Sequence, residues 1–127
     1  AITHDAQTAI FKLVPLPSGA DVLAQLFTKL SDKGIVVDVI SQSELDQGQR
    51  LAFSVPVEDI IHTQKIVNDF FPKVDVTVLD NVSKVSIVGV GMRNHPGVAA
   101  KFFSVLAQNK IAVHLVTTSE IKVSAII

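Results

Sequence analysis

The spacing of apolar residues along the first part of the chain predicts alternating strands and helices. Apolar residues recur at helical spacing and predict a helix over residues 22–33, with Asp21 as its N-cap and Gly34 at its end. A second helix is predicted over residues 58–71, ended by Pro72. β-Branched runs and two-residue alternation predict strands at residues 8–15, 35–40, 51–55 and 74–78. This order is typical of the ferredoxin-like βαββαβ fold, in the α+β class.

The first helix and the strand after it are repeated 76 positions later, so that residue 22 corresponds to residue 98. Identical residues occur in the second copy opposite Val22, Ala24, Phe27, Leu30, Ile35, Val37, Ser43 and Glu44. The second copy predicts a helix at residues 97–109 and strands at residues 85–92, 111–117 and 122–127. A gap-free repeat of this length predicts two similar small domains, residues 1–80 and residues 81–127.

The second copy has no counterpart of the second helix and last strand of the first, so we expect this domain to be incomplete at its C-terminus. A half-built domain exposes a sheet edge, and bare edges pair readily. The candidates to cover that edge are residues 1–6, another chain, or sequence outside this chain. The start at Ala1 rather than Met fits a fragment or a processed subunit.

Composition narrows the classes of function. Apolar residues make up 48% of the chain and charged residues 18%, so small domains of this kind should pack on one another or on a second chain. A net charge of −1 and the absence of Trp and Tyr give no case for nucleic acid or an anionic membrane as partner. No apolar run reaches the length of a membrane span. The absence of cysteine excludes disulfides and fits a cytoplasmic protein.

Motifs for catalysis, cofactors and metals are incomplete. Gly89-Val90-Gly91 lies between a predicted strand and helix, but Asn94 stands where a dinucleotide fingerprint needs its third glycine. The four histidines come from different elements and share no metal-ligand spacing. No serine–histidine–aspartate or paired-carboxylate pattern can be assembled. The sequence therefore predicts no catalytic residue, no metal and no cofactor.

The loop before the third predicted helix is a candidate binding element. Proline at a helix start, here Pro96, costs no hydrogen bond, and Gly97 lets the backbone approach a ligand closely. The free N–H groups of such a helix end suit a small carboxylate, although Asn94 could equally serve only as a cap. The hydroxyls and carboxylate of residues 117–120 suit an α-amino group, or simply end a strand.

At residues 89–101 and 117–124 the chain closely resembles the regulatory region of aspartate kinases, and residues 2–5 resemble the segment that enters this region. That region is a tandem of ACT domains, which are ferredoxin-like modules that bind amino acids. The resemblance implies a feedback sensor that binds lysine, threonine or both, usually between two chains, and shifts the kinase between active and inhibited states. It also implies a homodimer formed through ACT domains, and a kinase catalytic domain or kinase-bearing subunit as partner. No kinase domain is present in this chain, so we expect no catalysis by it.

The resemblance also implies effector-binding positions. In the second repeat they are Met92, Asn94, His95, Pro96 and Gly97, with Ala112, Val113, His114, Thr118 and Ser119 on the facing strand. In the first repeat they are Asp21 at the end of a turn over residues 18–21, then Val37, Asp38, Gln42 and Ser43. The resemblance implies that the backbone of the Pro96-Gly97 turn and of Val113 would bind the ligand's α-carboxylate and α-amine. In the first repeat, the carboxylate of Asp38 suits an effector ammonium group.

The chain departs from the family pattern at several of these positions. The first repeat lacks the usual Asp-x-Pro-Gly turn, Val36 and Ala112 stand where asparagine is common, and His114 replaces an acidic residue. These departures weaken the case for lysine and leave the effector open between lysine, threonine and both. They also support an alternative, a structural dimerisation module whose effector sites no longer function. A third reading, an intact enzyme, has no catalytic groups to support it.

Overall fold

The computed structural model describes residues 2–89, 97–119 and 121–127, and it divides into two compact units. The first unit comprises Gln7–Asn81. The second unit comprises Ala1–Ala6 together with Val82–Ile127. Two long strands, β1 (Ile2–Leu16) and β4 (Asp75–Val88), contribute residues to both units.

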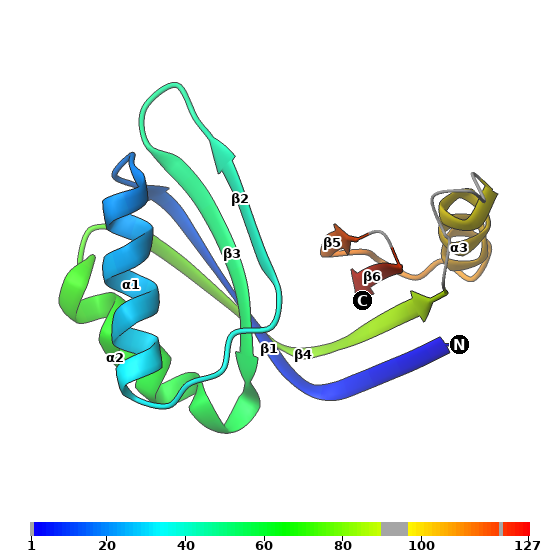
Figure 1. Ribbon diagram of the computed structural model, residues 1–127, viewed down its shortest axis with the longest axis horizontal. Helices are drawn as coiled ribbons and strands as arrows, with labels where there is room; N and C mark the ends of the chain where they lie inside the picture. Colours follow the sequence, from blue (N-terminus) through cyan, green and yellow to red (C-terminus); the bar gives the residue numbers. More distant parts are fainter. Residues whose placement is uncertain (1, 90–96, 120) are drawn as a thin grey trace. The chain divides into compact units, whose positions relative to one another are not determined.

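The first unit has the predicted βαββαβ order. Between β1 and β4 lie α1 (Ala20–Asp32), β2 (Ile40–Glu44), β3 (Gln49–Pro56), the 3-10 turn η1 (Val57–Asp59) and α2 (Ile60–Phe70). The strands of this unit are arranged in the order β2-β3-β1-β4, and β3 is antiparallel to both β1 and β2. The two helices lie side by side along the sheet (Figure 1). The ferredoxin-like fold predicted from the sequence is confirmed.

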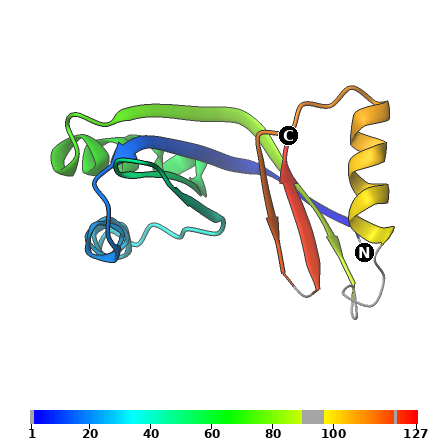
Figure 2. The ribbon, with the colours of Figure 1, turned by 90° about the horizontal axis from the view of Figure 1, so that it is seen from above.

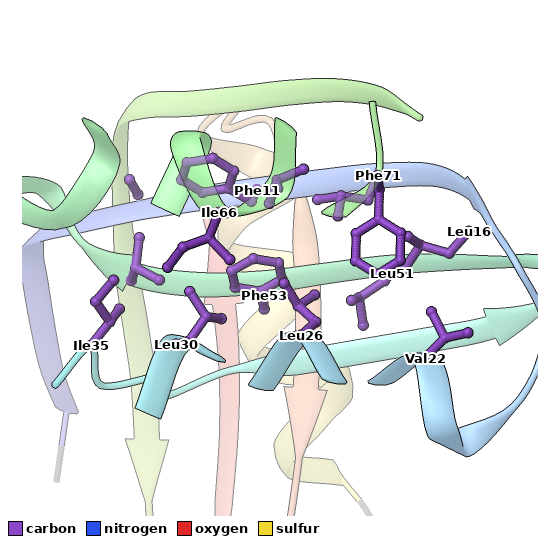
Figure 3. Packing of buried hydrophobic residues seen from close by; sticks show 14 residues of the cluster. Phe11, Leu16, Val22, Leu26, Leu30, Ile35, Leu51, Phe53, Ile66 and Phe71 are labelled. Carbon is purple, nitrogen blue, oxygen red and sulfur yellow. The ribbon is translucent and has the colours of Figure 1, made fainter. Parts of the chain in front are cut away.

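The core of the first unit lies between its helices and its sheet. Phe11 of β1 and Phe53 of β3 are directly paired, fully buried, and stack with ring centroids 5.6 Å apart. Leu26 and Leu30 of α1 point toward these rings, and Ile66 of α2 approaches them as well (Figure 3). Burying a side chain of this size stabilises folding by about 1.5–3 kcal/mol. The apolar face predicted for α1, which carries Leu26 and Leu30, therefore holds this helix on the sheet.

The second unit contains α3 (Gly97–Gln108), β5 (Leu115–Thr118) and β6 (Lys122–Ile126), together with the outer parts of β1 and β4. Its strands are arranged in the order β1-β4-β6-β5. Figure 2 shows α3 beside this sheet, and Phe102 and Leu106 of the helix pack on Val123 and Ala125 of β6. These two helix residues correspond to Leu26 and Leu30 in the repeat, so both helices bury equivalent positions.

The strand after the first helix of each repeat begins later than predicted. Residues 35–39 and 111–114 are irregular, and regular pairing starts at β2 and β5. In both copies the helix ends on a residue with positive φ, 71° at Gly34 and 55° at Lys110. The next N–H, of Ile35 or Ile111, then donates 3.0 Å back to the helix carbonyl five residues earlier. The N–H groups of Ile35 and Ile111 therefore close the helix ends, although both residues were predicted to begin a strand.

Two strand boundaries also differ from the prediction. A single strand, β4, replaces the two predicted at residues 74–78 and 85–92; residues 90–92 lie outside the described part of the chain. Ser83 and Ile127 exchange backbone hydrogen bonds of 3.0 and 2.9 Å, which keeps the middle of β4 extended. β1 continues to Leu16, past the predicted stop, because a register shift between Leu13 and Leu16 accommodates the proline between them.

The helix starts were also predicted imperfectly. The prediction of Asp21 as N-cap is wrong, because α1 begins at Ala20 and its N-cap is Gly19. Gly19 has φ 112°, a conformation that glycine adopts without a Cβ clash, so the turn closes two residues earlier than expected. The second helix begins with the 3-10 turn η1, and α2 proper starts only at Ile60.

Candidate functional site

The candidate site of the second repeat is described in part. Met92, Asn94, His95 and Pro96 lie outside the described residues. Gly97 is the first residue of α3 and is exposed. A Cβ built on Gly97 would meet no heavy atom of the described residues within 4 Å.

Thr118 and Ser119 lie at the end of the sheet where the chain leaves β4. The N–H of Gly89, just after β4, donates 2.8 Å to the carbonyl of Ile121 in the β5–β6 hairpin. Within that hairpin the Ser119 N–H donates 2.8 Å to the Lys122 carbonyl, and the Ser119 hydroxyl accepts at 3.4 Å from the Ile121 N–H. Thr118 and Ser119 are exposed, so their hydroxyls face solvent at the end of the sheet that leads into the candidate loop.

Ala112, Val113 and His114 lie at the opposite end of β5. The His114 N–H donates 2.7 Å to the carbonyl of Ile126, which fixes this segment beside the end of β6. All three residues are exposed. Because β5 has 4 residues and a strand rises about 3.3 Å per residue, roughly 13 Å separates this group from Thr118 and Ser119. A single unit therefore does not bring the two groups of predicted residues together.

In the first repeat, the predicted turn and the predicted strand residues are joined by Gln49. This residue opens β3 and is 3% exposed. Its amide nitrogen donates to the carbonyls of Pro17 at 2.8 Å and of Gly19 at 3.2 Å. Its amide oxygen accepts from the side chain of Gln42 at 2.9 Å. The turn before α1 is thus held to β2 and β3 by one buried amide.

Sequence reasoning missed Gln49. The signal was present, because Gln49 occupies the same face of β3 as the buried residues Leu51 and Phe53. A polar side chain at an inward-facing strand position is informative, since buried polar groups are almost always hydrogen-bonded. The sequence could not identify the partner of Gln49, because Pro17 lies 32 residues away along the chain.

The other predicted residues of the first repeat lie on different elements. Asp21 is exposed in the first turn of α1, and its carboxylate folds back toward Gly19, so that a Cβ built on Gly19 would stand 2.5 Å from Oδ1 of Asp21. Val37 is half-buried against the core, and Asp38 is exposed; both precede β2. Ser43 lies within β2 opposite Arg50 and is exposed.

Three cavities of about 510, 470 and 380 Å³ occur in the described part of the chain, and no predicted site residue lines any of them. One of them lies in the first unit, beside Pro17, Gly48 and Phe70. Among the described residues no cluster of three histidine, aspartate or glutamate side chains could hold a metal ion. None of the described helices has the length and hydropathy needed to span a membrane.

Comparisons with known proteins point to one family. A family model described as an ACT domain matches residues 85–127. Aspartokinase 2 of Bacillus subtilis is 37% identical over 131 residues, which cover 99% of this chain and 32% of the relative. The chain therefore spans about a third of the length of this full-length relative (32%).

Solved structures match nearly the whole chain. The ligand-free regulatory subunit of aspartate kinase from Thermus thermophilus superposes with a TM-score of 0.88 at 28% identity, covering 98% of this chain and 85% of that one. A chain from the structure of aspartokinase alpha and beta subunits superposes with a TM-score of 0.87 at 35% identity, covering 98% and 84%. These matches include the described parts of both repeats.

Proposed function

Because this chain belongs to the aspartokinase family, as a regulatory region built from ACT domains, we propose that it senses lysine, threonine or both and controls kinase activity allosterically. The main support is the match along 98% of the chain to an aspartokinase subunit of which it covers 84%. We further propose that the chain does not itself catalyse phosphoryl transfer, and that a catalytic domain or a kinase-bearing subunit receives its signal.

The layout of the second repeat supports a site completed by a second copy. The two groups of predicted residues lie about 13 Å apart at opposite ends of β5, so a short effector such as threonine would contact only one of them within a single chain. The segments at the sheet edges of both repeats also expose large apolar side chains: Val36 (69%), Ile40 (51%), Ile111 (38%), Val113 (40%) and Val116 (41%). Exposed apolar patches of this kind favour association. Pairing of two chains along these edges would cover them and would place edge residues of one copy beside the turns of the other.

The effector hypothesis is tested by a thermal-shift series with lysine, threonine, methionine and isoleucine. A ligand at a hundredfold excess over its dissociation constant stabilises by about 2.7 kcal/mol, which should raise the unfolding midpoint by several degrees. We expect a rise with lysine, threonine or both, and none with the D-enantiomers as matched controls. Equal midpoints with every amino acid would contradict the proposed sensing function.

A second candidate function is structural dimerisation without effector binding. The observation that favours it is in the first repeat, where Gln42 already bonds to Gln49 and the usual turn motif is missing. Sedimentation equilibrium with and without lysine and threonine separates the two functions. A dimer whose dissociation constant changes with the amino acid supports sensing, and a dimer indifferent to all of them supports the structural role.

A further inference from the structure

A cavity between the two helices of the first unit is lined mainly by charged side chains. The helices α1 and α2 lie side by side (Figure 1), and the cavity has a volume of about 380 Å³. Its lining residues are Lys29, Lys33, His62, Lys65, Ile66, Asp69 and Phe70. Sites for small molecules have volumes of roughly 300–1,000 Å³, so a small ligand fits this cavity. Three ammonium groups and one carboxylate give the lining a net charge of +2, with histidine counted as neutral.

The two lysines of α1 are placed on the same side of their helix. The ammonium nitrogen of Lys29 lies 5.7 Å from the centroid of the Phe70 ring, a cation–π contact that joins α1 to α2. Lys33 is the C-cap residue of α1 and follows four positions later, which brings its side chain to the same face. Lys29 and Lys33 have no ion-pair partner among residues 2–89, 97–119 and 121–127. Their charges are therefore available to a ligand in the cavity.

The third lysine of the cavity has only a weak partner. The ammonium nitrogen of Lys65 lies 3.8 Å from Oδ2 of Asp69, and the two side chains are 77% and 63% exposed. Exposed ion pairs of this kind contribute little free energy, because water screens them. A ligand with more than one negative charge therefore competes with Asp69 for Lys65.

The positive charge of this cavity is not a common feature of the two repeats. The 76-residue offset places Val105 and Asn109 of α3 at the positions of Lys29 and Lys33. The helix dipole favours lysine in the last turn of α1, but its effect does not extend to Lys65 in the middle of α2. Neither the shared fold nor the helix dipole therefore accounts for all three lysines.

We propose that this cavity binds a phosphate group, as inorganic phosphate or as the phosphoryl group of a small phosphate monoester. Such a group carries a charge of about −1.5 to −2 at pH 7, which matches the net charge of the lining. Lysine ammonium groups bind phosphate oxygens as point charges, and the imidazole of His62 offers a further N–H donor. A monocarboxylate has too little charge to neutralise the lining. This inference goes beyond the proposed amino-acid sensing and does not depend on it.

The test is a titration of the whole chain, followed by the amide NMR signals of residues 29–33 and 62–69. The probes are inorganic phosphate, glycerol 2-phosphate, acetate and the peptide triglutamate, all at one pH and one ionic strength. We expect saturable shifts with inorganic phosphate, glycerol 2-phosphate or both, and none with acetate. The phosphate compound that binds more tightly identifies the source of the ligand. Added sodium chloride should weaken the binding, because salt screens charges on exposed groups.

A double substitution tests the two lysines of α1. Lys29→Gln together with Lys33→Gln should weaken phosphate binding by at least about tenfold. The matched control is Arg50→Gln together with Lys73→Gln, which removes the same charge from exposed positions of the first unit outside this cavity. The control should leave the affinity within about twofold. Equal weakening by the two double variants would overturn the site, because only the overall charge would then matter.

A second substitution should strengthen binding. Asp69→Asn removes the carboxylate that competes for Lys65, so the affinity for phosphate should rise by about threefold. Asp46→Asn removes an exposed carboxylate from the hairpin between β2 and β3 and should have no such effect. Shifts that increase without saturation would overturn the proposal. Saturable binding of triglutamate without binding of either phosphate would also overturn it, in favour of an acidic protein segment.

Discussion

At the scale of single residues, the end of each helix shows how two copies of one motif solve the same backbone problem with different side chains. Gly34 and Lys110 are equivalent in the repeat, and both adopt positive φ where their helix ends. Glycine adopts this conformation without a Cβ clash, whereas a residue with a side chain is strained there by about 1–2 kcal/mol. Lys110 therefore carries a cost that its counterpart avoids.

We expect Lys110→Gly to stabilise the chain by about 1 kcal/mol, because the relief of backbone strain exceeds the added flexibility of the unfolded chain. Urea denaturation measures the free energy of unfolding. Gly34→Ala is the matched reverse change, since a Cβ there meets nothing within 4 Å and only the backbone cost remains; it should destabilise by about 1 kcal/mol. If Lys110→Ala stabilised as much as Lys110→Gly, backbone strain would not be the cause.

Residue-scale chemistry was the part least accessible from the sequence. The sequence shows where Gln42 and Gln49 lie along the chain. It does not show that their side chains are hydrogen-bonded, because this contact depends on how β2 and β3 pair. The late start of β2 was missed for a similar reason, because the N–H of Ile35 bonds a helix carbonyl. Hydrophobic periodicity reports which face is buried and not where each backbone group is satisfied.

At the scale of elements, the turn before α1 is tied to two strands through Gln49. The helix itself was predictable, because Leu26 and Leu30 fall on one stripe and both are fully buried. The attachment of its first turn was not, because it depends on a polar contact across 30 residues of sequence. Helix position is therefore set by apolar packing along its length and by one amide at its start.

We expect Gln49→Leu to destabilise the first unit by about 2 kcal/mol, since the carbonyls of Pro17 and Gly19 lose their donor in a partly buried setting. Gln42→Leu removes only the less buried partner and should cost less than about 1 kcal/mol. Amide hydrogen exchange of residues 18–22 gives a local readout, and faster exchange is expected in Gln49→Leu. Equal destabilisation by the two substitutions would show that the turn is not anchored in this way.

At the scale of the whole molecule, the ferredoxin-like fold predicted from the internal repeat is confirmed, and the chain divides into two compact units. The prediction of β4 as two separate strands was wrong because the residues between them, around Ser83, stay extended through pairing with Ile127. No local pattern indicates such a pairing, since Ser83 and Ile127 are far apart in the sequence. Self-similarity therefore indicated the fold but not where its strands begin and end.

The apolar edge residues lead to a prediction about assembly. We expect the double substitution Val36→Lys and Ile40→Lys to weaken self-association by about tenfold or more, because it replaces apolar area that pairing would bury with charge. Ile61→Lys is the matched control, since Ile61 is 80% exposed on α2, away from the edge. Sedimentation equilibrium measures the dissociation constant. Similar effects of the edge and control substitutions would contradict association through this edge.

The sharing of β1 between the two units affects how the chain can fold while it is being synthesised. Ala1–Ala6 belongs with Val82–Ile127, so the first unit is nested inside the second along the chain. Residues 2–6 leave the ribosome before the nested unit, and the rest of their own unit leaves after it. The nested unit can therefore fold while the earlier strand segment waits, and any nascent chain that stops at residue 81 carries an unpaired strand end, the kind of exposed edge that chaperones protect.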